Sequence, residues 1–154
     1  MANVDPQQVE SLVLGFRPGE HDRLRDLLVE VFQRLPEEDA EILIEERKIR
    51  FLLTTRNQAI YLPAGDHYLL VLESSFLNWL HSAQVYTLVH EMAHAFLEHK
   101  AISAKVEFLA DRRVVKWGFE DELEAVPNSY LRGSGMEQVF GVTRTGIMNE
   151  KKGG

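Results

Sequence analysis

The chain has 154 residues, of which 45% are hydrophobic and 27% are charged, a composition typical of a soluble globular protein with one main core. Its formal net charge of −7 argues against a general nucleic-acid binder, because recognition of phosphates needs a basic surface. The chain has no cysteine, which excludes disulfides and thiolate ligands, so a metal site would have to use histidine and carboxylate side chains.

The sequence carries no sign of a membrane segment. No uninterrupted apolar stretch approaches the roughly 18 residues that cross a bilayer, and the first residues lack the basic and then apolar pattern of a signal peptide. We therefore expect a cytoplasmic protein that binds neither membranes nor nucleic acid. The sequence does not indicate an oligomeric state.

Residues 1–20 are expected to form an N-terminal extension, because prolines and glycines interrupt them and leave room for one short helix around Pro6 to Leu14. From His21 to Leu35, apolar residues recur at the helical period, and the proline that follows ends this helix. The acidic residues Glu37 to Asp39 suit the positive end of a helix dipole, so a second helix is predicted to reach about Glu46.

Three short strands are predicted next. The segment Ile49 to Thr55 is rich in β-branched and aromatic residues, residues 56–58 can turn, and Ala59 to Leu62 can return as a strand. After another turn, Tyr68 to Glu73 is apolar enough for a third strand. We therefore expect an α+β fold with a small, mainly antiparallel sheet just before the helices described next.

The stretch Leu88 to Leu97 contains the pattern HExxH, formed by His90, Glu91 and His94. The apolar spacing around it predicts a helix, on which residues four apart project from the same face, so the two histidines can bind one metal ion. The Glu91 carboxylate would then accept a proton from a water that the metal has acidified. Taken alone, the pattern also fits a helix with two ordinary histidines and a solvated glutamate.

A second amphipathic helix is predicted after this pattern, with Ser103 as its N-cap and Gly118 as its C-terminal stop. Glu107 and Asp111 lie four apart on it. Catalytic zinc sites usually keep three protein ligands, so we expect Glu107 to be the third ligand and Asp111 to accept a hydrogen bond from a ligand histidine. A solvated face with local ion pairs is the alternative for both residues. His99, near the turn, is an alternative ligand, although a histidine at a helix end is more often a capping or surface residue.

The HExxH pattern followed on the next helix by Glu-x-x-x-Asp resembles the gluzincin branch of zinc metallopeptidases. The short gap and small size are most similar to compact members such as the ImmA/IrrE-type bacterial peptidases. The resemblance covers about Tyr68 to Phe119, roughly a third of the chain. It implies a zincin-like metallopeptidase domain, which we delimit as residues 21–119, and a polypeptide substrate bound in extended form at a sheet edge.

The resemblance also implies the roles of individual residues. It implies one zinc ion per chain, an orienting role for Asp111, Glu91 as general base, and the zinc ligands His90, His94 and Glu107. The predicted function is therefore a zinc metalloendopeptidase. Two alternatives stay open: a non-catalytic zinc-binding domain that recognises a partner, and a zinc hydrolase of another amide or ester.

The remainder of the sequence is less informative. Peptide hydrolysis needs a second donor for the developing oxyanion, and Tyr130 is our choice, with Arg132, His81, Tyr86 and His67 as alternatives. Residues 120–154 are expected to form a partly flexible C-terminal segment that could inhibit the site. Within it the sequence predicts a short helix at Met136 to Phe140 and a disordered end from Asn149 to Gly154.

Overall fold

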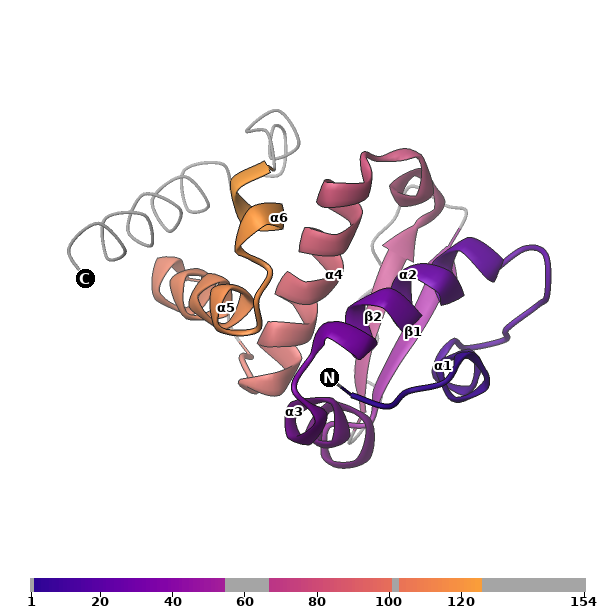
Figure 1. Cartoon of the computed structure of the whole chain (residues 1–154), viewed down its shortest axis with the longest axis horizontal. Coiled ribbons are helices and arrows are strands. Elements are labelled where there is room, and N and C mark those ends of the chain that lie inside the picture. Colours follow the sequence, from indigo (N-terminus) through magenta and orange to yellow (C-terminus); the bar gives the residue numbers. More distant parts are fainter. Residues whose placement is uncertain (1, 55–66, 101–102, 126–154) are drawn as a thin grey trace.

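The computed structural model describes residues 2–54, 67–100 and 103–125. They form an α+β fold that consists mostly of helices and contains a two-stranded sheet (Figure 1). In chain order the elements are α1 (Pro6–Leu12), α2 (Asp22–Arg34), α3 (Glu37–Glu41), the π-helix η1 (Ile42–Glu46), β1 (Ile49–Thr54), β2 (Tyr68–Glu73), the 3-10 helix η2 (Ser74–Asn78), α4 (His81–Phe96), α5 (Ala104–Lys116) and α6 (Glu120–Ala125).

The helices predicted in the first third of the chain are confirmed. α1 begins after Asp5, whose carboxylate accepts a hydrogen bond from the Gln8 backbone N–H at 2.8 Å, and the helix has a proline in its first turn. α2 occupies nearly the whole predicted range. The predicted second helix begins as α3 and continues to Glu46, but its last five residues form the π-helix η1.

The sheet is parallel, so the predicted mainly antiparallel arrangement is wrong. β1 and β2 pair in register from Ile49 with Tyr68 to Thr54 with Glu73. Residues 55–67 connect them, and thirteen residues suffice to return the chain to the starting end of the sheet, whereas a hairpin needs only a few. The turn predicted at 56–58 and the strand predicted at Ala59 to Leu62 lie outside the described residues.

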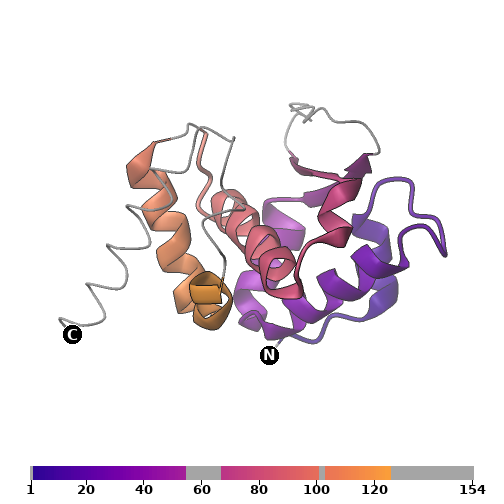
Figure 2. The same ribbon diagram turned by 90° about the horizontal axis from the view of Figure 1, so that it is seen from above.

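α4 runs through the middle of the described fold. α2 and the sheet lie on one side of it, and α5 and α6 lie on the other (Figures 1 and 2). The core collects fully buried side chains from elements far apart in the sequence: Val9 of α1, Leu28 of α2, Phe51 of β1, Leu88 of α4 and Val114 of α5. The first helix therefore shares one core with the two helices that carry the predicted metal ligands.

Aromatic packing joins α2 to the sheet. The rings of Phe32 and Phe51 meet edge to face with their centroids 6.3 Å apart, and both are fully buried.

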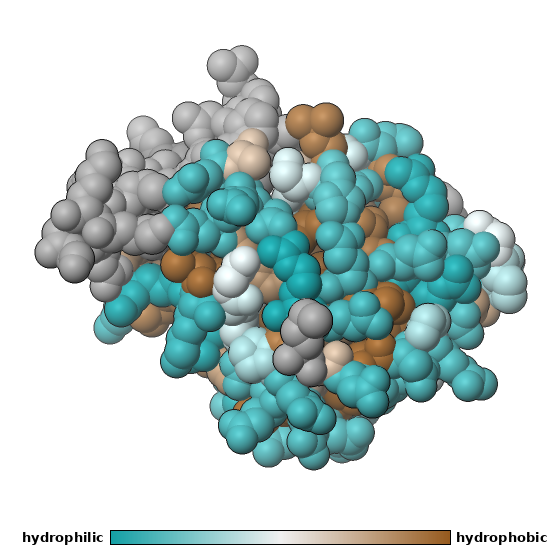
Figure 3. All heavy atoms as spheres, viewed as in Figure 1, coloured by the Kyte–Doolittle hydropathy of each residue, from teal (hydrophilic) through white to brown (hydrophobic). Residues whose placement is uncertain are grey.

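The face seen in Figure 3 is covered mainly by hydrophilic side chains, and hydrophobic atoms appear only in small, separate areas. Among the described helices, none combines the length and the apolar character that a bilayer crossing requires.

The core assignment predicts unequal effects for two identical substitutions. Leu28 is fully buried, whereas Leu80, just before α4, is 59% exposed. Leu28→Ala should lower the free energy of unfolding by about 2–5 kcal/mol, because it removes buried apolar surface and leaves a cavity. Leu80→Ala should change it by less than about 0.5 kcal/mol. Urea denaturation followed by circular dichroism measures both, and equal losses would contradict the assignment.

Candidate metal centre

The helix predicted around the HExxH pattern is confirmed as α4. Its apolar residues at helical spacing, including Leu88 and Met92, are fully buried, and this fixes the rotation of the helix about its axis. At its C-terminal end the Arg47 guanidinium donates a hydrogen bond from Nε to the Phe96 carbonyl oxygen at 3.1 Å. The positive charge of Arg47 at this end also interacts favourably with the negative pole of the helix dipole.

The second predicted helix is confirmed as α5, which lies beside α4 (Figure 1). Ser103 caps it by accepting a hydrogen bond from the Val106 backbone N–H at 3.3 Å. Gly118 follows its last residues with φ +88°, a left-handed conformation that favours glycine. Both termini predicted for this helix are therefore correct.

Three of the predicted site residues meet between these helices. His90 Nε2 lies 2.8 Å from Glu107 Oε2, and His94 Nε2 lies 3.1 Å from Glu107 Oε1. The two imidazole Nε2 atoms are 3.1 Å apart. Among the described residues, this is the one group of three or more histidine and acidic side chains whose possible ligand atoms all lie within 4.8 Å of one another.

The three donor atoms fit a zinc ion by chemistry and by spacing. Two imidazole nitrogens and one carboxylate form a usual ligand set for catalytic zinc. Ligands ~2.0–2.1 Å from zinc at the corners of a tetrahedron are ~3.3 Å apart. The observed separations of 2.8 to 3.1 Å are close to that value, so small side-chain shifts would admit the ion.

Asp111 lies behind His90, on the side away from Glu107. Its Oδ1 is 2.8 Å from His90 Nδ1, and its side chain is fully buried. A carboxylate only accepts hydrogen bonds, so Nδ1 carries a proton, and Nε2 is the ring nitrogen that faces His94 and Glu107. When a metal ion displaces the proton on Nε2, the bond to Asp111 keeps the other proton on Nδ1, which is the tautomer that the ion requires.

Opposite charges in this buried group shift two pKa values strongly. Burial alone would lower the pKa of His90, but hydrogen bonds with Asp111 and Glu107 raise it to about 10. Burial alone would raise the pKa of Glu107, but hydrogen bonds with His90 and His94 lower it to about 2. In the metal-free protein, a proton on His90 therefore supplies the positive charge that these carboxylates need.

His99 contacts His94 and does not join the group of three ligands. The two Nδ1 atoms are 2.9 Å apart, and the His99 backbone N–H donates to the His94 carbonyl oxygen at 3.0 Å. Burial and the nearby His94 lower the pKa of His99, which favours its neutral form. A neutral His99 ring can accept the Nδ1 proton of His94, which leaves His94 Nε2 free to bind a metal ion.

Glu91 is exposed on α4 next to the buried His90, a candidate metal ligand. Its charge lies close enough to contribute to the raised pKa of His90. An acidic side chain that is near the ligands and open to water can accept a proton from a water at that site. The general-base role therefore remains compatible with the position of Glu91.

Two of the alternative oxyanion donors have hydrogen-bond partners away from the side of His90 that faces Glu107. His81, at the first turn of α4, has its Nε2 2.8 Å from Glu30 Oε2 on α2. The Tyr86 hydroxyl donates a hydrogen bond to Asp111. Asp111 lies at Nδ1 of His90, whereas Glu107 lies at Nε2. His67 is exposed and precedes β2. Tyr130 and Arg132 lie outside the described residues, as do the C-terminal helix and disordered end predicted at Met136 to Phe140 and Asn149 to Gly154.

Two contacts of the ligand histidines were not predicted. Tyr86 stands four residues before His90, and this helical spacing was a usable signal for a shared face. His99 contacts His94 from a turn at the end of α4, where Glu98 adopts a left-handed conformation with φ +56°. Few non-glycine residues adopt that conformation, so this contact could not be predicted from local sequence patterns.

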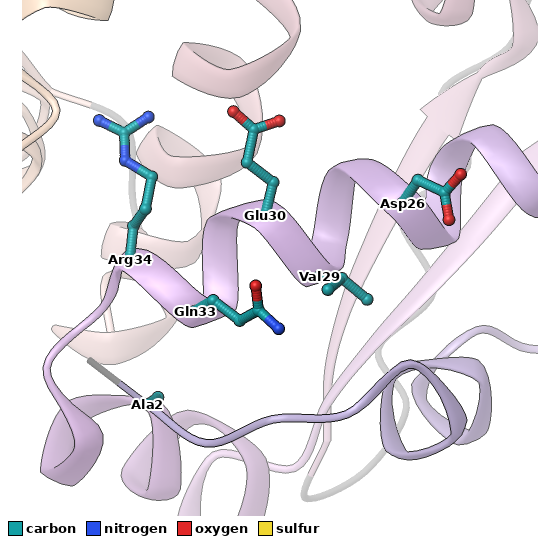
Figure 4. Close-up of a pocket in the computed structure, with 6 residues that line it drawn as sticks. All are labelled: Ala2, Asp26, Val29, Glu30, Gln33 and Arg34. Carbon is teal, nitrogen blue, oxygen red and sulfur yellow. The ribbon is translucent and has the colours of Figure 1, made fainter.

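A hollow of about 400 Å³ lies elsewhere, along the outer face of α2. Figure 4 shows its six lining residues, which are Ala2, Asp26, Val29, Glu30, Gln33 and Arg34. Their polar groups already have partners: Glu30 meets His81, Gln33 donates to the Val4 carbonyl, and Arg34 pairs with Glu122. None of the candidate metal ligands lines this hollow. The cluster of His90, His94 and Glu107 is therefore the better candidate for a functional site.

Comparisons with protein-family models, with curated proteins and with solved structures found no match for the chain.

The raised pKa of His90 predicts that zinc binding releases a proton. At pH 7 the His90 ring is protonated, because its pKa is about 10, and a metal ion must displace this proton to reach Nε2. We expect about one proton released per zinc at pH 7, and an affinity for zinc that rises with pH toward the pKa of His90. Calorimetric titration in buffers of different ionisation enthalpy measures the release.

His81→Gln is the control for this measurement, because it removes an exposed histidine that pairs with Glu30. The variant should release the same number of protons as the natural sequence. Zinc binding without proton release would show that His90 is neutral before the metal arrives.

Proposed function

We propose that the protein is a zinc-dependent metallopeptidase of gluzincin type that acts in the cytoplasm. In this proposal one zinc ion per chain is held by His90, His94 and Glu107, Asp111 orients His90, and Glu91 is the general base. We propose further that the α+β fold is zincin-like, with the metal ligands on its two adjacent helices.

One observation carries the proposal. The side chains of His90, His94 and Glu107 converge from two helices, and their ligand atoms lie within 4.8 Å of one another. The HExxH spacing by itself puts only the two histidines on one face. The Glu107 carboxylate, thirteen residues after His94, converges on the two histidines. This third candidate ligand supports a true metal site over a chance occurrence of the motif.

The residues of the chain would divide the chemistry between them. When bound, zinc supplies a Lewis acid that acidifies a water and polarises the scissile carbonyl. Glu91, exposed next to the ligand His90, takes a proton from the attacking water and returns it to the leaving nitrogen. Asp111 and His99 keep the two ligand histidines in the tautomers that direct Nε2 inward.

The number of ligands favours a catalytic site over a structural one. Structural zinc sites usually have four protein ligands, whereas catalytic sites have three and leave one position for water or substrate. Within the described ranges, the cluster contains three candidate ligands, and the acidic residue next to His90 is exposed to water. A buried and fully ligated ion that only held the helices together would not need Glu91.

We propose a polypeptide in extended form as the substrate. β2 is followed by the short helix η2 and then by α4, so the sheet and the HExxH helix are adjacent in the chain and in the fold. An extended peptide can bind along strand backbone through main-chain hydrogen bonds. Neutralisation of the buried carboxylates by a metal ion would leave a site suited to an uncharged peptide bond.

The proposal predicts that two glutamate-to-glutamine substitutions have different effects. Glu91→Gln should keep about one zinc per chain but lower peptide hydrolysis by about 10²–10⁴-fold, because a proton acceptor is lost while the ligands remain. Glu107→Gln should lose zinc and hydrolysis together, because it removes a ligand charge. Metal content measured by mass spectrometry and turnover of a fluorogenic peptide library test both expectations.

Glu41→Gln is the matched control, because Glu41 is exposed on α3. It should retain both zinc and activity. A natural-sequence protein that binds no zinc would overturn the proposal. Zinc binding with full function in Glu91→Gln would instead indicate a non-catalytic domain, and hydrolysis of esters or other amides without cleavage of peptides would indicate a different substrate class.

A further inference from the structure

Tyr86 stands one helical turn before His90 on α4, and its side chain is buried. Its hydroxyl donates a hydrogen bond to Asp111 Oδ1 at 2.7 Å. The same oxygen accepts the bond from His90 Nδ1 at 2.8 Å, and the hydroxyl oxygen is 3.4 Å from that nitrogen. The phenol, the carboxylate and the imidazole thus form one closed group on the side of His90 away from Glu107.

The Tyr86 hydroxyl stabilises the buried carboxylate of Asp111 by donating a hydrogen bond to it. Asp111 is fully buried, and a buried carboxylate is costly unless hydrogen-bond donors surround it. Hydrogen bonds from O–H to a carboxylate are short and among the stronger ones in proteins. Two donors that converge on Oδ1 from different directions fix the rotation of the carboxyl group, which a single donor does not.

Packing alone does not require this hydroxyl. The Tyr86 ring lies against the His90 ring, with centroids 5.4 Å apart, and phenylalanine would fill the same space. The hydroxyl adds the bond to Asp111, and Asp111 in turn determines which nitrogen of His90 carries the proton.

We propose that Tyr86 is a positioning residue of the metal centre, whose hydroxyl fixes Asp111 so that His90 keeps its proton on Nδ1 and directs Nε2 toward the ion. This inference rests on the proposed zinc site at His90, His94 and Glu107. It assigns to Tyr86 a role away from the reacting groups, whereas the sequence suggested it as an alternative donor to the oxyanion.

The test is the zinc affinity of Tyr86→Phe in the full chain. Competition with a chromophoric chelator should show a roughly tenfold weaker affinity than that of the natural sequence, the lower end of the 10–100-fold loss typical for partners of ligand histidines. Cobalt(II) in place of zinc should give a changed d–d absorption spectrum, because the orientation of His90 is less fixed. Circular dichroism and urea denaturation of the metal-free variant check that it is folded.

Trp117→Phe is the matched control. Trp117 Nε1 donates to Asp39 Oδ2 at 2.7 Å, so this substitution also removes a short bond from an aromatic donor to an aspartate, but at a place without metal ligands. It should leave zinc affinity and the cobalt spectrum unchanged even if stability falls. A loss of affinity as large in Trp117→Phe as in Tyr86→Phe would attribute the effect to general destabilisation and overturn the inference.

A double-mutant cycle tests whether Tyr86 acts through Asp111. Asp111→Asn alone should weaken zinc binding about 10–100-fold. If the hydroxyl works by fixing Asp111, adding Tyr86→Phe to that variant should cost less than twofold more, because the group on which it acts has already changed. Additive losses would overturn the inference.

These results separate the inference from the proposed function. If the natural sequence binds no zinc or cobalt, the proposed metallopeptidase fails and the inference fails with it. If the natural sequence binds zinc and Tyr86→Phe binds it equally well, the metal site stands and only the role assigned to Tyr86 is wrong.

Discussion

A buried ionic group between α4 and α5 is the constraint on which the rest of the structure depends. His90, Glu107 and Asp111 are exposed by 3%, 4% and 0%, so each is almost completely removed from water. Burial of one such group without a partner would cost several kcal/mol, on the order of the stability of a whole domain. The two helices must therefore bring all of these side chains together, and their packing is tied to the geometry of the site.

This group needs a positive charge at its centre. Two carboxylates flank the His90 ring, one at each nitrogen, and the strong rise in the pKa of His90 shows how far they favour a cation there. A proton meets this need with one charge, and a divalent ion would meet it with two. Nitrogen and carboxylate donors suit zinc better than calcium or magnesium, which prefer an all-oxygen set. The arrangement that brings α4 and α5 together is thus also the arrangement at which we propose that a metal ion binds.

Contacts at the C-terminal ends of the two helices hold this arrangement in place. Arg47, after the π-helix η1, binds the last carbonyl of α4. The Arg113 guanidinium lies over the Phe96 ring, 4.8 Å from its centroid, and links α5 to the end of α4. A site whose residues sit on helices anchored in this way keeps its geometry better than a site on loops.

The sequence by itself predicted the three long helices and the candidate metal ligands, because the helices follow from local apolar spacing and the candidate ligands from short motifs. Apolar residues at the helical period fixed α2, α4 and α5, and residues four apart had to share a face, which paired His90 with His94 and Glu107 with Asp111. Only the tertiary structure decided the direction of the sheet, the convergence of Glu107 on the two histidines, and the contacts of Tyr86 and His99. These features depend on how segments distant in the chain pack and on a left-handed turn at Glu98, and neither is encoded in local periodicity.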